Sequence, residues 1–98
     1  MKVLWTLEAL ERLFEIENFI AQDSPKRARQ FVGALIERGD SLSENPRRGR
    51  PVPEISNPHI RELIIKNYRI VYRLRRDQIE ILTVFEGHRQ LGIDDLEE

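Results

Sequence analysis

The stretch that decides the fold of this chain is IRELIIKNYRIVYRL, residues 60–74. It contains two runs rich in β-branched and aromatic residues, 60–65 and 68–75, joined by Lys66-Asn67, which is short enough for a two-residue hairpin turn. Side chains of the second run fall on two faces, because successive residues of a strand point to opposite sides. One face holds Tyr68, Ile70, Tyr72 and Leu74, and the other holds Arg69, Val71, Arg73 and Arg75. We therefore predict a β-hairpin with one buried face.

The hairpin extends on its C-terminal side into a third strand. Arg76-Asp77 provides a turn, residues 79–85 form another run of β-formers, and Gly87 closes that run. On the N-terminal side, residues 45–59 contain four prolines and are predicted to form a loop. Strands joined by tight turns pair with their neighbours, so we expect an antiparallel meander of three strands.

Two helices are predicted ahead of these strands. Between residues 7 and 22 apolar side chains recur at helical spacing, and Thr6 is suited to cap the N-terminus. The apolar side chains are Leu10, Leu13, Phe14, Ile16, Phe19 and Ile20. A second helix is expected to begin at Pro25, capped by Ser24, and to end before Pro46. Because the link between the two helices is short, they must pack side by side.

A short strand over residues 2–5 completes the element order β-α-α-β-β-β. We predict an α+β fold in which an antiparallel, mostly meander sheet is covered on one face by the N-terminal helical hairpin. The chain has 98 residues and shows no internal repeat. Residues 1–98 are therefore expected to form a single domain.

Charge is strongly segregated along the chain. The formal net charge is −1, yet residues 45–76 hold nine Lys and Arg side chains against Glu54 and Glu62. Residues 77–98 hold Arg89 against seven acidic residues. The central segment is suited to a polyanionic partner, although the same arginines would equally serve to hydrate strands and loops.

The composition disfavours several classes of protein. There is no cysteine, so disulfides and thiolate metal sites are excluded, and two histidines alone make no convincing zinc site. No phosphate-binding glycine loop is present. We expect neither a cofactor nor a metal. The N-terminus is unlike a signal peptide and no apolar run could span a bilayer, so we expect a cytoplasmic location and no membrane partner.

Seven short segments carry a resemblance to a known family through their order and spacing. They are NFIA (18–21), DSP (23–25), NP (45–46), GRPVPE (49–54), IREL (60–63), NYRIVYRL (67–74) and HR (88–89). Together they resemble the RelE/ParE superfamily of toxins from type II toxin–antitoxin systems, and ParE more than RelE. The resemblance covers nearly the full chain.

This resemblance implies a partner and a regulatory role. The chain would be a growth-inhibiting toxin neutralised by a cognate antitoxin protein, which lays an extended or helical segment over the helical hairpin and part of the sheet. Operator DNA would be contacted only through the antitoxin. A family member that has lost toxicity and only binds its antitoxin is a third possibility.

Two toxin mechanisms occur on this fold, and the resemblance implies different residues for each. A ParE-like toxin inhibits DNA gyrase, and the side chains that would bind this target are Arg50, Arg69, Arg73 and Arg89. A RelE-like toxin enters the ribosome and cleaves mRNA. The cations available for this chemistry would be Arg50, Arg61, Arg69 and Arg89 together with His88, and the catalytic candidates among them are Arg61, His88 and Arg89.

The ParE-like interpretation is favoured because several residues that a RelE-like active site would need are absent. RNA cleavage requires a base for the 2′-hydroxyl and cations for the scissile phosphate. Here Ile64 and Ile65 are apolar, no tyrosine follows His88-Arg89, and the C-terminal tail is acidic. Tyr68 and Tyr72 are in phase with the apolar face and are predicted to be core residues. For Arg69 and Arg73, the structural interpretation is that they hydrate an open sheet face.

Overall fold

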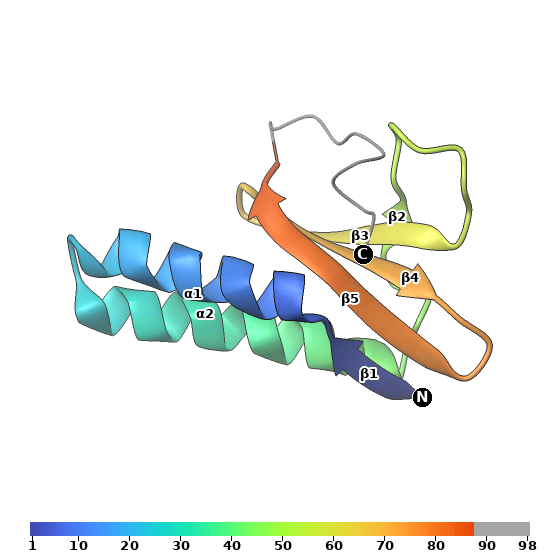
Figure 1. Ribbon diagram of the computed structural model, residues 1–98, viewed down its shortest axis with the longest axis horizontal. Coiled ribbons are helices and arrows are strands. Elements are labelled where there is room, and N and C mark those ends of the chain that lie inside the picture. Colours follow the sequence, from blue (N-terminus) through green and yellow to red (C-terminus); the bar gives the residue numbers. More distant parts are fainter. Residues whose placement is uncertain (88–98) are drawn as a thin grey trace.

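The computed structural model describes residues 1–87, in which a five-stranded sheet lies against a pair of long helices (Figure 1). The helical elements are α1 (Leu7–Ala21), α2 (Pro25–Asp40) and the 3₁₀ turn η1 (Ser41–Ser43). The strands are β1 (Lys2–Trp5), β2 (Arg50–Pro51), β3 (Ile60–Ile65), β4 (Tyr68–Leu74) and β5 (Gln78–Glu86). The element order and the α+β fold predicted from sequence are confirmed.

Both helices begin where the sequence places their caps. The Thr6 hydroxyl oxygen accepts a hydrogen bond from the backbone N–H of Ala9 at 3.1 Å, and that of Ser24 accepts one from Arg27 at 3.2 Å. Pro25 occupies the first turn of α2, where a missing N–H costs no helical hydrogen bond. These local interactions satisfy N–H groups that have no partner inside the helix.

The strand order is β1-β5-β4-β3-β2. Strands β3, β4 and β5 form the predicted antiparallel meander, with Lys66 at a positive φ of 55° in the first turn. Strand β1 pairs with β5 in parallel, so the sheet is mixed, and β2 pairs with β3 inside the segment predicted to be a loop. Neither short strand pairing could be read from periodicity, because β1 and β5 are far apart in sequence and β2 has only two residues.

One face of the sheet and the helical hairpin enclose the main core. The largest side chains in it with almost no exposure are Tyr72, Leu35, Leu42, Ile70, Ile79 and Ile81. Burying an aliphatic side chain of this size contributes about 1.5–3 kcal/mol. Trp5 packs against this core, and its indole N–H donates to Asp40 at 2.9 Å. Within residues 1–87, neither helix has the length and hydrophobicity needed to cross a membrane.

A second, smaller core covers the opposite face of the sheet. It consists of the buried side chains Val52, Ile60, Val71, Leu82 and Phe85, with Ile55 packed against them. The segment between β2 and β3 folds back over the sheet here, and the Val52 N–H donates to the Ile60 carbonyl at 3.1 Å. The prediction that this face of β4 is open to solvent is therefore wrong at its centre.

Candidate functional site

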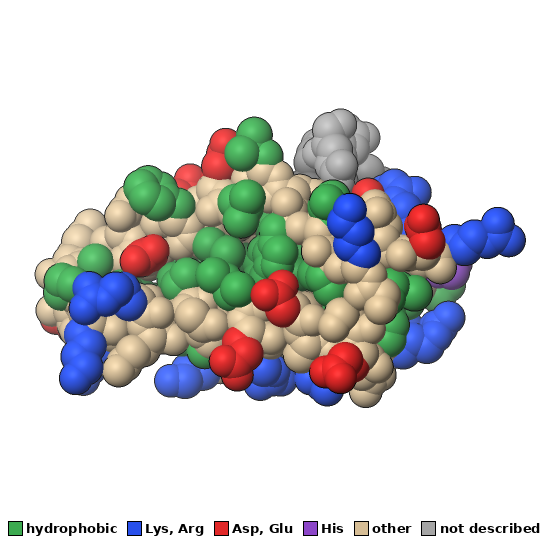
Figure 2. Space-filling model, turned by 90° about the horizontal axis from the view of Figure 1, so that it is seen from below, with side chains coloured by type: hydrophobic (Ala, Val, Ile, Leu, Met, Phe, Trp, Pro, Cys, Tyr) green, Lys and Arg blue, Asp and Glu red, His purple; other side chains and the backbone are tan. Residues whose placement is uncertain are grey.

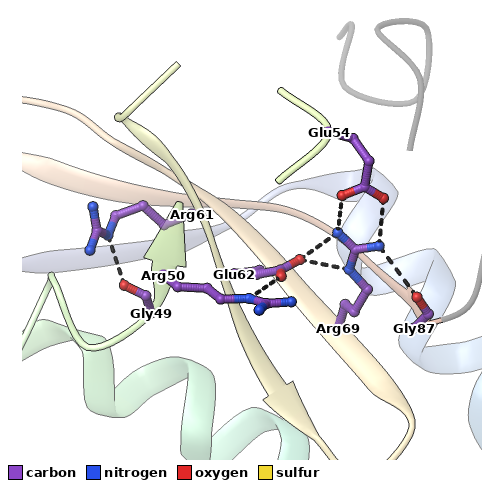
Figure 3. A network of polar contacts seen from close by, with 7 residues as sticks. All are labelled: Gly49, Arg50, Glu54, Arg61, Glu62, Arg69 and Gly87. Carbon is purple, nitrogen blue, oxygen red and sulfur yellow. Dashed lines mark hydrogen bonds and ion pairs between the residues drawn. The ribbon is translucent and has the colours of Figure 1, made fainter. Parts of the chain in front are cut away.

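Four charged side chains meet on the second face of the sheet beside this smaller core (Figure 3). Arg50 of β2 lies opposite Glu62 of β3, Arg69 comes from β4, and Glu54 comes from the segment that covers the sheet. We call these four residues the arginine–glutamate network. Alternation along β3 and β4 directs Glu62 and Arg69 to the same face as the smaller core.

Glu62 is the centre of the network, with a side chain that is 0% exposed. Its Oε1 accepts a hydrogen bond from Arg69 Nε at 2.6 Å, and its Oε2 accepts one from Arg50 Nε at 2.7 Å. The Arg69 guanidinium also holds both oxygens of Glu54, at 2.9 and 2.8 Å, and donates to the Gly87 carbonyl at 3.3 Å. The Arg69 side chain is only 6% exposed, so its hydrogen-bonding capacity is used inside the protein.

The network stabilises the charged form of Arg69. Hydrogen bonds, above all those to Glu54, raise the pKa of the Arg69 guanidinium, while desolvation acts in the opposite direction. The guanidinium carbon also lies 5.3 Å from the centre of the Phe85 ring, a cation–π distance. Two arginines and two glutamates balance, so the network adds no net charge to a segment that is strongly basic in sequence.

The three predicted target-binding arginines within residues 1–87 differ in accessibility. The prediction that Arg69 faces outward is wrong, because Glu54 and Glu62 surround its guanidinium. Arg50 is exposed although its Nε is held by Glu62, and Arg73 is half-buried and forms no ion pair within residues 1–87. The sequence contained the signal for this outcome, since Glu54 and Glu62 are the only acids in the basic segment.

Arg61, a predicted catalytic residue, lies on the opposite face of the sheet from Arg69. It pairs across the strands with Tyr72, a core residue on the helical side. Its Nε donates to the Gly49 carbonyl at 2.9 Å, and its two terminal nitrogens lie 3.4 Å from the carbonyls of Pro58 and Arg47. Arg61 and Arg69 are thus not brought together. His88 and Arg89, the other predicted catalytic residues, lie outside the described residues.

Tyr72 is a core residue, as its phase in β4 predicts. Its hydroxyl donates to the Pro46 carbonyl at 2.8 Å and accepts from the Gly49 N–H at 3.0 Å. Burial raises the pKa of the Tyr72 hydroxyl, and the hydrogen bond from Gly49 and the nearby Arg61 partly offset this shift. A Cβ on Gly49 would lie 2.5 Å from the Glu62 carbonyl oxygen, so this close approach requires glycine.

The helical side of the molecule exposes an apolar surface that includes several of the apolar residues at helical spacing in α1. Leu7 is 72% exposed, Phe14 is 65% exposed, and Leu10 and Phe19 are also exposed. Figure 2 shows hydrophobic side chains at the surface on this side of the molecule. We call Leu7, Leu10 and Phe14 the α1 stripe. The apolar residues of α1 extend over more than half of the helix circumference at 100° per residue, which is wider than one buried face requires.

An apolar groove lies between α1 and the adjacent ends of β4 and β5. Its volume is about 360 Å³, and its walls include Ile16 and Phe19 from α1, Tyr68 from β4, and Val84 and Phe85 from β5. The groove is also lined by the charged residues Arg12, Glu15 and Glu86. An apolar floor with charged residues beside it is suited to an amphipathic helix or an extended peptide.

Comparison with known proteins identifies relatives along almost the whole chain. The family described as "ParE toxin of type II toxin-antitoxin system, parDE" matches residues 3–91. A protein of Sinorhizobium fredii named "Putative toxin Y4kP" is 42% identical over 91 residues, covering 91% of each chain. A Caulobacter vibrioides protein named "Toxin RelE2" is 38% identical over 89 residues, covering 90% of this chain and 97% of its own.

Solved structures share the fold at lower sequence identity. A chain of the chromosomal ParDE toxin–antitoxin system from P. aeruginosa superposes with a TM-score of 0.74 at 22% identity, covering 88% of this chain and 95% of its own. A chain of the RelBE2 toxin–antitoxin complex from Mycobacterium tuberculosis gives a TM-score of 0.64 at 24% identity, covering 87% and 88%. Both comparisons support the helical hairpin on a mixed sheet described above.

Proposed function

The chain belongs to the ParE toxin family of type II toxin–antitoxin systems, and from this premise we propose that it acts in the cytoplasm as an inhibitor of DNA gyrase. In this proposal the toxin binds its target without itself making or breaking a covalent bond, and a cognate antitoxin neutralises it. The family membership supports the toxin role, and the arrangement of the arginines supports the non-catalytic mechanism.

The non-catalytic mechanism is supported by one main observation. The guanidinium groups of Arg61 and Arg69 are already engaged in hydrogen bonds within the protein. Cleavage of RNA needs cations that can approach the scissile phosphate as its charge develops. The Arg69 guanidinium is enclosed by Glu54 and Glu62, and two carboxylates at this position would repel a phosphate. Arg61 is directed to backbone carbonyls on the other face. Among residues 1–87, the predicted cations therefore do not converge on one phosphate.

We propose that Arg73 and Arg50 contact gyrase directly and that Arg69 acts by holding the surface on which they lie. Arg89, which lies outside the described residues, completes the proposed target-binding set. Arg73 forms no ion pair within residues 1–87, and its neighbour across the strands is Glu80. Arginines that have no internal ion pair and lie on a strand of a sheet often contribute much of the binding energy of a protein interface.

The test is a gyrase supercoiling assay with purified toxin and with an Arg73→Glu variant. We expect wild-type toxin to inhibit supercoiling and the variant to lose at least about fivefold in potency, which corresponds to about 1 kcal/mol. Arg29→Glu is the matched control, since Arg29 is exposed on α2 and forms no ion pair within residues 1–87. Gyrase that remains fully active in the presence of wild-type toxin would disprove this target.

For the antitoxin, we propose that an amphipathic segment covers the α1 stripe and the apolar groove. Phe14→Glu places a charge on the stripe and should weaken antitoxin binding at least tenfold by calorimetry, because it removes an apolar anchor. Ile64→Glu is the control, since Ile64 is exposed on β3, away from the helices. Equal weakening by the two variants would contradict this docking surface.

A second candidate is a RelE-like ribosome-dependent endoribonuclease, which the name of the Caulobacter relative favours. It predicts mRNA cleavage on translating ribosomes, lost when Arg61, His88 or Arg89 is replaced by alanine. Inducing the toxin without antitoxin and comparing transcript integrity with gyrase-linked DNA breaks separates the two mechanisms. Normal growth after induction would instead support the third possibility, a family member that only binds its antitoxin.

A further inference from the structure

A basic cleft opens at the end of the molecule where β1 begins and β4 turns into β5. Its volume is about 640 Å³, and Arg47, Arg75 and Arg76 contribute to its walls together with His59, Leu74 and the N-terminal residue. No acidic residue within 1–87 lines it. Figure 2 shows Lys and Arg side chains gathered at this end, opposite the α1–α2 turn. The cleft shares no lining residue with the apolar groove, and none of the four residues of the arginine–glutamate network lines it.

The backbone that carries these arginines is held in place by hydrogen bonds. The N-terminal ammonium donates to the Ser43 carbonyl at 3.0 Å, and the Tyr72 hydroxyl holds the Pro46 carbonyl at 2.8 Å. On the opposite wall, the Leu74 N–H donates to the His59 carbonyl at 2.8 Å. Two separate segments thus present their cations toward one opening, and this preorganisation reduces the entropy lost when an anion binds.

Two of the three arginines are available to a ligand. Arg47 and Arg76 are exposed and form no ion pair within residues 1–87. Arg75 donates through Nε to Glu80 at 2.9 Å, which orients its guanidinium, and its side chain is 48% exposed. Asp77 follows Arg76 in the turn but does not line the cleft. Cations therefore outnumber acids in the described lining of the cleft.

We propose that this cleft binds the backbone phosphates of duplex DNA, so that the toxin contributes its own contact with DNA beside any made by its antitoxin. Arginine forks match the geometry of phosphate oxygens. No Phe, Tyr or Trp side chain within residues 1–87 lines the cleft, whereas single-stranded nucleic acids are normally bound by stacking bases on several aromatic rings. The inference does not depend on gyrase being the target.

The test uses the full-length toxin and a fluorescein-labelled duplex of arbitrary sequence, measured by anisotropy between about 50 and 200 mM salt. We expect micromolar binding at the lower salt concentration that weakens as salt rises. The Arg47→Glu/Arg76→Glu double variant should lose at least tenfold in affinity, and its log–log salt slope should be shallower by about 2, one per phosphate contact removed.

Arg29→Glu/Arg38→Glu is the matched control, because both arginines are exposed on α2 and the net charge changes equally. This control should bind DNA within about twofold of wild type. Circular dichroism and antitoxin binding establish that both double variants are folded. Equal loss in the two variants would overturn the cleft as the site, and so would the absence of DNA binding at low salt. Competition by poly-glutamate as effective as that by unlabelled duplex would overturn DNA in favour of an acidic protein partner.

Discussion

The arginine–glutamate network and the basic cleft draw their arginines from the same basic segment, yet their central arginines differ in burial and in pairing with carboxylates. In the network, Arg69 is buried and neutralised by Glu54 and Glu62. In the cleft, Arg47 and Arg76 are exposed and have no carboxylate partner within residues 1–87. A count of basic residues therefore does not locate a binding surface. The position of a few acids decides which arginines stabilise the fold and which remain available.

The largest effect should come from removing the central carboxylate of the network. Glu62→Gln leaves Arg69 buried without one of its two anions, and breaking a buried ion pair from one side costs about 3–5 kcal/mol. Urea unfolding monitored by circular dichroism measures this change. Glu54→Gln is the comparison, and we expect a smaller loss because that side chain is partly exposed. A Glu62→Gln loss below about 1 kcal/mol would mean that the network contributes little to stability.

Gly49 packs closely against the Glu62 carbonyl and the Tyr72 side chain, between the two regions. Adding a side-chain atom at this position should have the next largest effect. Gly49→Ala places a Cβ against the Glu62 carbonyl and the Tyr72 ring, so overpacking should cost about 1–3 kcal/mol. Gly33→Ala is the matched control, because a Cβ there meets nothing within 4 Å. In the middle of a helix that change should stabilise the protein by about 0.5–1 kcal/mol. Thermal unfolding of both variants should therefore shift in opposite directions.

Tyr72 connects the main core to the wall of the basic cleft through Pro46. Tyr72→Phe leaves the Gly49 N–H without this acceptor and should cost about 1–2 kcal/mol. The pKa of the Tyr72 hydroxyl is raised above 10.0 in the folded protein, so the unfolded chain releases this proton first as pH rises. Stability should thus fall above about pH 10, and less steeply in Tyr72→Phe. An identical pH dependence of urea unfolding in both proteins would contradict this assignment.

The smallest effect is expected at the ion pair beside the cleft. Arg75 is 48% exposed and contacts Glu80 at 2.9 Å, and solvent screening reduces the value of such a pair. Arg75→Gln should change the free energy of unfolding by no more than about 0.5 kcal/mol. A loss as large as that of Glu62→Gln would remove the distinction between the two regions. Chemical denaturation at low and high salt provides the measurement.

Helix α1 shows which features follow from local sequence and which depend on packing. Its helical period and the cap at Thr6 were predicted correctly, because both depend on residues within a few positions of one another. The same spacing grouped Leu10, Phe14 and Phe19 with Leu13 and Ile16, yet only Leu13 and Ile16 are buried and the other three are exposed. Spacing identifies which residues share a helix face, but only the packing of α2 and the sheet determines how wide a face is buried. The excess apolar surface is what we assign to the antitoxin.

Local spacing and strand alternation are enough to predict the two helices, their caps, the three-strand meander and the core position of Tyr72. The parallel pairing of β1 with β5, the coverage of the second sheet face and the separation of Arg61 from Arg69 are instead consequences of how the chain folds in three dimensions. These features bring together residues far apart in the chain. The energies of these contacts depend on which charges and apolar surfaces come together when the chain folds. The local sequence pattern contains no information about such contacts.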